Sequence, residues 1–92
     1  PKEELVNLTS IIRRTATTIG QHLVEGANAP VERESSIPLQ SAITATSQLE
    51  YQVLLAHDLG YLDGVTHDEL TTEIYEVRRM MQTHLVRVRS LR

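Results

Sequence analysis

Apolar residues recur every three or four positions along the first part of the chain, over residues 2–25. This spacing places side chains on one face of an amphipathic helix and predicts a first helix over that range. Pro1 suits its first turn, and Gly26 is placed to end it in the left-handed conformation. Gly20 lies inside the helix, where glycine costs about 1 kcal/mol relative to alanine, so we expect a close packing contact there. The predicted buried stripe consists of Leu5, Leu8, Ile12, Ala16, Ile19 and Leu23.

The densest apolar run lies within Ser47–Leu62 and belongs to a second helix that ends at Gly60. The body of this helix runs from about Pro38 to Leu59. So wide an apolar surface predicts contacts on two sides, within a helical bundle and with another subunit. The predicted buried positions are Leu39, Ala42 or Ile43, Thr46, Leu49, Val53 and Ala56, with Leu54, Leu55 and Leu59 widening the stripe.

The start of the second helix has two interpretations. Ser36 could cap a helix that holds Pro38 in its first turn, giving a range of 37–59. Alternatively, the helix begins near Val31, after Pro30, and bends at Pro38, giving a range of 31–59. The sequence leaves both open.

A capping-box pattern, Thr66-His67-Asp68-Glu69, predicts the start of a third helix over 67–90. The short connection to the second helix implies that these two helices are antiparallel neighbours. Its predicted buried stripe is Leu70, Ile74, Val77, Met81, Leu85 or His84, Val88 and Leu91. No stretch alternates as a strand does, so the fold class is all-α: an up-down antiparallel bundle.

The composition narrows the class of protein. The chain has 92 residues, which suits one helical domain over 1–92, and it carries a net charge of −3. A chain this small is marginal alone, so we expect oligomerisation. It has no cysteine, no apolar run of the roughly 20 residues that span a membrane, and no signal-peptide pattern. A soluble cytoplasmic protein is therefore expected.

The sequence offers no catalytic constellation. No histidine follows a glutamate at the Glu-x-x-His spacing of di-iron bundles, and His22 with Glu25 is the only reversed pair. Glycine-rich phosphate loops and nucleophile elbows are also absent from the sequence. We therefore predict no enzyme activity, no cofactor and no metal site.

Arginines gather near the end of the chain. Residues 76–92 hold five arginines and one acidic residue, Glu76. One interpretation is a surface that binds nucleic-acid phosphates; the other is that basic residues complement the helix dipole and solvate the bundle. The candidate nucleic-acid-binding residues are Arg13, Arg14, Arg78, Arg79, Arg87, Arg89 and Arg92.

Ordered blocks along the chain carry a family resemblance. They are Pro1-Lys2-Glu3-Glu4-Leu5, Ile12-Arg13-Arg14, Ala16, Ile19, Glu25-Gly26, Ser47, Leu49-Glu50, Leu54 and Ala56-His57-Asp58-Leu59-Gly60-Tyr61-Leu62. Together they resemble the bacterial four-helix-bundle family of 23S rRNA intervening-sequence proteins, which includes the accessory variability determinant proteins of diversity-generating retroelements.

The resemblance implies more than the residues do. In that family a further helix precedes the block at Pro1, so three helices of a four-helix bundle are expected in this chain. The resemblance also implies a ring-like homopentamer, the assembly that members of the family share, and the retroelement relatives bind nucleic acid and a reverse transcriptase. The leading hypothesis is a non-enzymatic homo-oligomer with a role in binding RNA or DNA. The alternative is a protein-binding adaptor with no nucleic-acid role.

Overall fold

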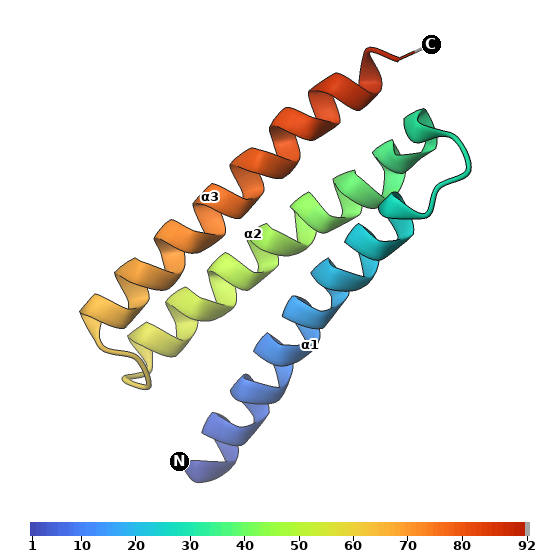
Figure 1. Ribbon diagram of the computed structural model, residues 1–92. Helices are drawn as coiled ribbons and strands as arrows, with labels where there is room; N and C mark the ends of the chain where they lie inside the picture. The colour runs from blue at the N-terminus through green and yellow to red at the C-terminus, as the bar shows by residue number, and fades with distance from the viewer. Residues whose placement is uncertain (92) are drawn as a thin grey trace.

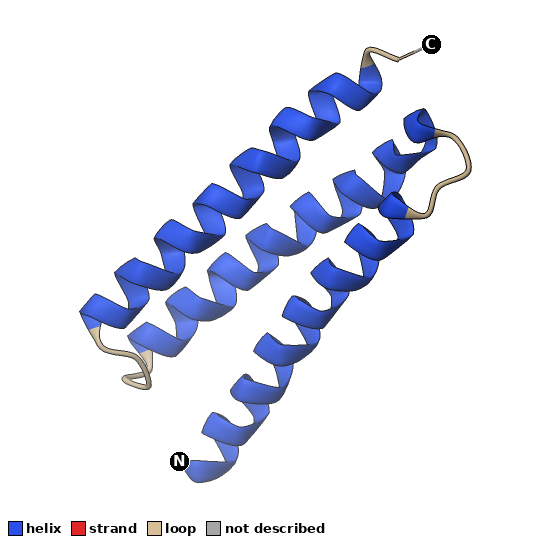
Figure 2. Cartoon of the chain, viewed as in Figure 1, coloured by secondary structure: helices blue, strands red, loops and turns tan. Residues whose placement is uncertain are grey.

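The computed structural model describes residues 1–91 and confirms the all-α fold class (Figure 1; Figure 2). Arg92, one of the candidate phosphate-binding arginines, lies outside the described residues. The predicted helices are confirmed to within one turn at each end. In chain order the elements are α1 (Lys2–Ala27), the 3₁₀ turn η1 (Glu32–Ser35), α2 (Ser36–Asp58) and α3 (Gly64–Arg89).

Helix α2 lies in the middle, with α1 packed along one side of it and α3 along the other (Figure 1). The two outer helices do not contact each other. Each helix runs antiparallel to the next, as in an up-down bundle, and the Cα atoms span 51 × 22 × 13 Å. The described chain is therefore an up-down arrangement of three helices in which α1 and α3 flank α2.

The core lies around α2. The predicted positions Leu39, Ala42, Ile43, Thr46, Val53 and Ala56 are buried, and Ala45 joins them. In α3 the buried residue is Leu85, which settles the choice between it and His84. Leu54 and Leu59 are exposed, as is Leu91 at the end of the chain, so the prediction that their side chains belong to the buried stripes is wrong.

The predicted stripe of α1 is largely uncovered. Only Leu8 and Ile19 are buried, whereas Leu5 is 42% and Leu23 is 38% exposed. The reason is that α2 is the only long helix of the described chain that packs against α1, so most of the apolar face of α1 that does not meet α2 stays open to water. Val77 of α3, also predicted to be buried, is 38% exposed for the same reason.

Neither interpretation of the start of α2 is fully right. Ser36 is already the first helical residue rather than the cap, and η1 precedes it instead of a continuous helix from Val31. The buried Ser35 hydroxyl donates a hydrogen bond to the carbonyl oxygen of Glu32, 2.7 Å away, which holds this turn. Pro38 does lie in the first turn of α2, where its missing N–H costs little.

The turn between α2 and α3 is closed by hydrogen bonds at both helix ends. Gly60 adopts a φ of +86°, and the amides of Gly60 and Tyr61 donate to the carbonyls of His57 and Ala56, a Schellman motif. This confirms the predicted helix stop. The capping box at Thr66 is wrong, because Asp63 lies earlier in the chain and its carboxylate accepts from the Thr66 amide at 2.7 Å, so α3 begins at Gly64.

Two predictions about glycines in α1 are also wrong. Gly26 does not adopt a left-handed conformation; α1 continues to Ala27 and ends at Asn28, whose side-chain amide donates to the Val24 carbonyl. At Gly20, no other described atom apart from its two chain neighbours and the adjacent backbone of its own helix lies within 4 Å of where a Cβ would stand, so the expected close contact is not made. Among helices within residues 1–91, none is long and apolar enough to cross a membrane.

Candidate binding groove

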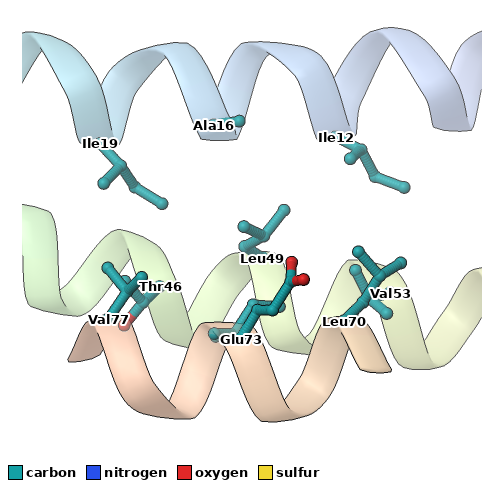
Figure 3. A pocket seen from close by; sticks show the side chains of 10 residues that line it. Ile12, Ala16, Ile19, Thr46, Leu49, Val53, Leu70, Glu73 and Val77 are labelled. Atoms are coloured by element: carbon teal, nitrogen blue, oxygen red, sulfur yellow. The ribbon is translucent and has the colours of Figure 1, made fainter. Parts of the chain in front are cut away.

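An apolar groove runs between α1 and α3, with α2 as its floor (Figure 3). Ile12 and Ala16 form the α1 wall, Leu49 and Val53 lie on the floor, and Leu70 and Val77 form the α3 wall. The open cavity has a volume of about 340 Å³. Its lining is almost entirely apolar, which makes it the candidate for a binding site.

Helix periodicity explains why the groove is apolar. Ile12, Ala16 and Ile19 follow one another at spacings of four and three, and so do Leu70, Ile74 and Val77. A bundle helix carries an apolar stripe about 100° wide or wider, and each outer helix uses only part of that stripe against α2. The remaining part faces the groove. Because full burial of a large aliphatic side chain contributes about 1.5–3 kcal/mol, covering the groove would be favourable.

Glu73 is the one charged residue among those that line the groove in the described part of the chain. Figure 3 shows its carboxylate directed over the groove from α3, beside Leu49. It forms no ion pair with any residue in 1–91. A ligand in the groove would therefore meet apolar surface and a single negative charge.

The other face of the α1–α2 pair is more polar than the groove. Its hollows are lined by hydroxyl and amide side chains, including those of Thr18, Gln40, Thr44 and Gln48, together with His22. The side-chain oxygen of Gln52 on this face is buried without a hydrogen-bond partner among the described residues. This face mixes hydrogen-bonding groups with apolar side chains such as Ile11 and Tyr51, so it is a weaker candidate for binding an apolar helix face than the groove.

The candidate arginines are spread over two helices that do not touch. Arg13 and Arg14 lie exposed on α1, and neither they nor the exposed Arg79 of α3 form an ion pair within residues 1–91. Arg79 lies near the middle of α3, away from the end of the helix that carries Arg87 and Arg89.

The other described arginines of α3 already have partners. The guanidinium of Arg78 donates to both carboxylate oxygens of Glu50, at 3.2 and 3.4 Å, and joins α3 to α2. Arg87 pairs with Glu32 and contacts His84, and Arg89 donates to the side-chain oxygen of Gln40 at 3.3 Å. These contacts use donors that a phosphate-binding surface would need.

The histidines and carboxylates at the α2–α3 turn contact one another and cap the start of α3. The His57 and His67 rings stack with centroids 4.6 Å apart. Within residues 1–91 no three His, Cys, Asp or Glu side chains are grouped so that they could hold a metal ion. The hydrogen bond from the Thr66 amide lowers the pKa of the Asp63 carboxyl, as expected of a helix cap.

Tyr61 ties this turn to the start of α1. Its hydroxyl donates to the Pro1 carbonyl at 3.1 Å. Desolvation and the nearby Glu4 carboxylate raise the pKa of Tyr61, because both disfavour the phenolate. This contact spans the sequence from one end of α1 to the α2–α3 turn and helps to hold the outer helix in place.

The groove was predicted only in part from the sequence. The excess of leucine in Ser47–Leu62 predicted a surface with two neighbours, but it did not say which residues would remain uncovered. The position of Glu73 within the stripe of α3 was not recognised, because a single glutamate in an amphipathic helix is ordinarily a solvent-facing residue.

The fold and the groove define an up-down bundle of helices with an uncovered apolar groove along one side of the described chain. A family model described as 23S rRNA-intervening sequence protein matches residues 1–83, and the chain belongs to this family. The family is not known as an enzymatic one. No curated protein and no solved structure shows a significant match to the chain.

Proposed function

We propose that this protein is a non-enzymatic assembly module that binds an amphipathic helix in the groove between α1 and α3. The observation that carries the proposal is the groove itself: a strip of aliphatic side chains from three helices, with no described part of the chain covering it. Helix-in-groove binding uses such a surface, and the bound helix completes a four-helix bundle.

The test uses a labelled synthetic helix with a leucine stripe and an uncharged glutamine and serine polar face. We expect saturable binding to the 92-residue chain by fluorescence anisotropy. Ala16→Asp and Val77→Asp each place a carboxylate in the groove at an exposed position, so each variant should fold and bind the helix at least about tenfold more weakly.

Matched controls come from the outer faces of the same helices. Val24→Asp on α1 and Val86→Asp on α3 introduce the same charge where the side chains are 62% and 71% exposed, and neither residue lines the groove. These variants should bind as the parent chain does. Equal affinity for all four variants would contradict the proposal.

We also propose that the bundle associates into a homo-oligomer, with a pentamer as the expected number. Support comes from large apolar side chains exposed outside the groove, among them Ile37 (76% exposed), Val65 (68%) and Met80 (66%). Sedimentation or light scattering at micromolar concentration measures the assembly directly. A monomer under those conditions would overturn this part of the proposal.

Nucleic-acid binding is the second candidate function, and the free arginines favour it. Arg13, Arg14 and Arg79 are exposed and form no ion pair within residues 1–91. If they contact phosphates, affinity for RNA or DNA should fall steeply with salt, and the triple change to glutamine should reduce the salt slope by up to about 3. Affinity that responds to neither salt nor the substitutions would exclude this function.

A further inference from the structure

A second hollow lies between α1 and α2, on the other face of this pair from the groove; we call it the α1–α2 hollow. Its volume is about 680 Å³, within the range of small-ligand sites. Arg14 and Thr15 line it from α1, and Gln48, Tyr51 and Gln52 line it from α2. Because both walls belong to the packed pair α1 and α2, this hollow does not depend on what fills the groove between α1 and α3.

No carboxylate lines the α1–α2 hollow. Residues 15–24 of α1 and residues 35–49, which lead into and form most of α2, contain no Asp, Glu, Lys or Arg. Glu50 is the next charged residue, and it is paired with Arg78 of α3. Arg14 is exposed and forms no ion pair with another described residue. A ligand in this hollow would therefore meet one unpaired positive charge and no negative one.

Tyr51 adds an aromatic surface to the hollow. It is 64% exposed and is one of only three aromatic residues in a chain that has no Phe or Trp. Folding leaves this ring in water, although burial of an aromatic side chain is favourable. An exposed aromatic ring beside an arginine is the arrangement on which the bases of single-stranded nucleic acids stack.

Hydrogen-bonding groups complete the lining. Gln48 and Gln52 lie about one helical turn apart, and the side-chain oxygen of Gln52 has no partner among the described residues. The Thr15 hydroxyl donates to the Ile11 carbonyl, which leaves the hydroxyl oxygen able to accept a hydrogen bond. Amide side chains pair with the donor and acceptor groups on the edges of bases.

We infer that the α1–α2 hollow binds an unpaired nucleotide, with its base against the Tyr51 ring and its phosphate at Arg14. A single arginine supplies little affinity for a long polyanion in a chain of net charge −3, so the base contributes most of the binding. The nucleotide is either free or part of a single strand, since both present a base and a phosphate. The inference shares Arg14 with the nucleic-acid function proposed above, but it requires neither Arg13 nor Arg79.

The test is a nuclear magnetic resonance titration of the isotope-labelled 92-residue chain with three probes. They are adenosine monophosphate, a short single-stranded oligoadenylate and a DNA duplex of the same length. We expect saturable shifts of the Gln48 and Tyr51 backbone amides with one or both of the first two probes. The duplex should bind at least about tenfold more weakly than the better of them, because its bases are already stacked on one another and cannot reach Tyr51.

The first two probes also identify the source of the nucleotide. Binding of adenosine monophosphate as tight as that of the oligoadenylate assigns the hollow to a free nucleotide. Tighter binding of the oligoadenylate assigns it to a single strand. Both results support the inference, and tighter binding of the duplex than of the oligoadenylate would overturn it.

Protein variants assign the two contacts. Tyr51→Leu should weaken binding at least about fivefold because it removes the stacking surface, whereas Tyr75→Leu, at a 55% exposed position outside the hollow, should not. Arg14→Gln should weaken binding and reduce its salt dependence. Arg13→Gln, at the neighbouring exposed arginine that does not line the hollow, should leave both unchanged. Circular dichroism confirms that all four variants fold.

The outcomes separate this inference from the nucleic-acid function proposed above. If Arg13→Gln and Arg14→Gln weaken binding equally and Tyr51→Leu has no effect, the arginines bind phosphates without a site for the base, and only the inference is wrong. If none of the three probes binds, both the inference and the nucleic-acid function fail.

Discussion

Two glycines of this chain have opposite backbone requirements. Gly60 has a φ of +86°, which residues with a Cβ atom rarely adopt. Gly20 has ordinary helical geometry with open space beside it. We expect Gly60→Ala to lower the free energy of unfolding by about 1–2 kcal/mol. Gly20→Ala should raise it by about 0.5–1 kcal/mol, because alanine is the better helix former. Urea denaturation measures both, and a destabilised Gly20→Ala would show an unrecognised contact at that position.

Asp63 makes the free energy of unfolding depend on pH in the acid range. Its pKa in the folded chain lies below the usual value of an aspartate, because the Thr66 amide donates to the carboxylate. The stabilisation is therefore present above the unfolded-state pKa and is lost as pH falls through the folded-state pKa. Asp63→Asn keeps an N-capping oxygen but should remove this part of the acid dependence of the melting temperature. An unchanged acid profile would contradict the role of the cap.

At the residue scale, the sequence predicts features that depend on neighbouring residues in the chain, such as a helix stop. Gly60 was identified correctly because a glycine after an apolar helical stripe is a frequent helix stop. The cap of α3 was misplaced because Asp63 and Thr66 are both good capping residues. Which of them caps the helix depends on the residue at which the turn after Gly60 ends. The empty space at Gly20 depends on neighbours and has no local signal.

The Glu50–Arg78 pair joins two elements. Two of the guanidinium nitrogens, Nη1 and Nη2, donate to the carboxylate, and the Arg78 side chain is 18% exposed. Arg78→Ala should lower the free energy of unfolding by about 1 kcal/mol, whereas Arg79→Ala, which breaks no ion pair of the described chain, should change it by less than about 0.5 kcal/mol. A double-mutant cycle with Glu50→Ala isolates the pair, and a coupling near zero would show that it contributes nothing.

At the element scale the helices follow from periodicity, while their burial does not. The stripe of α2 is buried almost as predicted, because α2 has a neighbour on each side. The stripe of α1 has the same spacing, yet Leu5 and Leu23 remain exposed because only one helix packs against it. The spacing of apolar residues indicates which face of a helix is suited to burial. Whether that face is buried depends on which elements pack against it in the fold.

For the whole molecule, the main feature is the open side of the bundle. The sequence correctly predicted an all-α up-down arrangement and a wide apolar surface on α2. It did not predict the groove as a site, since its walls come from residues about 60 positions apart, such as Ile12 and Leu70. The arginines singled out as a binding surface lie on separate helices or already pair with acidic and amide groups.

The most direct test of helix binding is a nuclear magnetic resonance titration of the isotope-labelled chain with the uncharged synthetic helix. The account predicts that the largest backbone amide shifts occur at Ile12, Ala16, Leu49, Val53, Leu70 and Val77, which line the groove. Shifts confined to the polar face around Thr18, His22 and Gln48, or no shifts at saturating helix concentration, would contradict it.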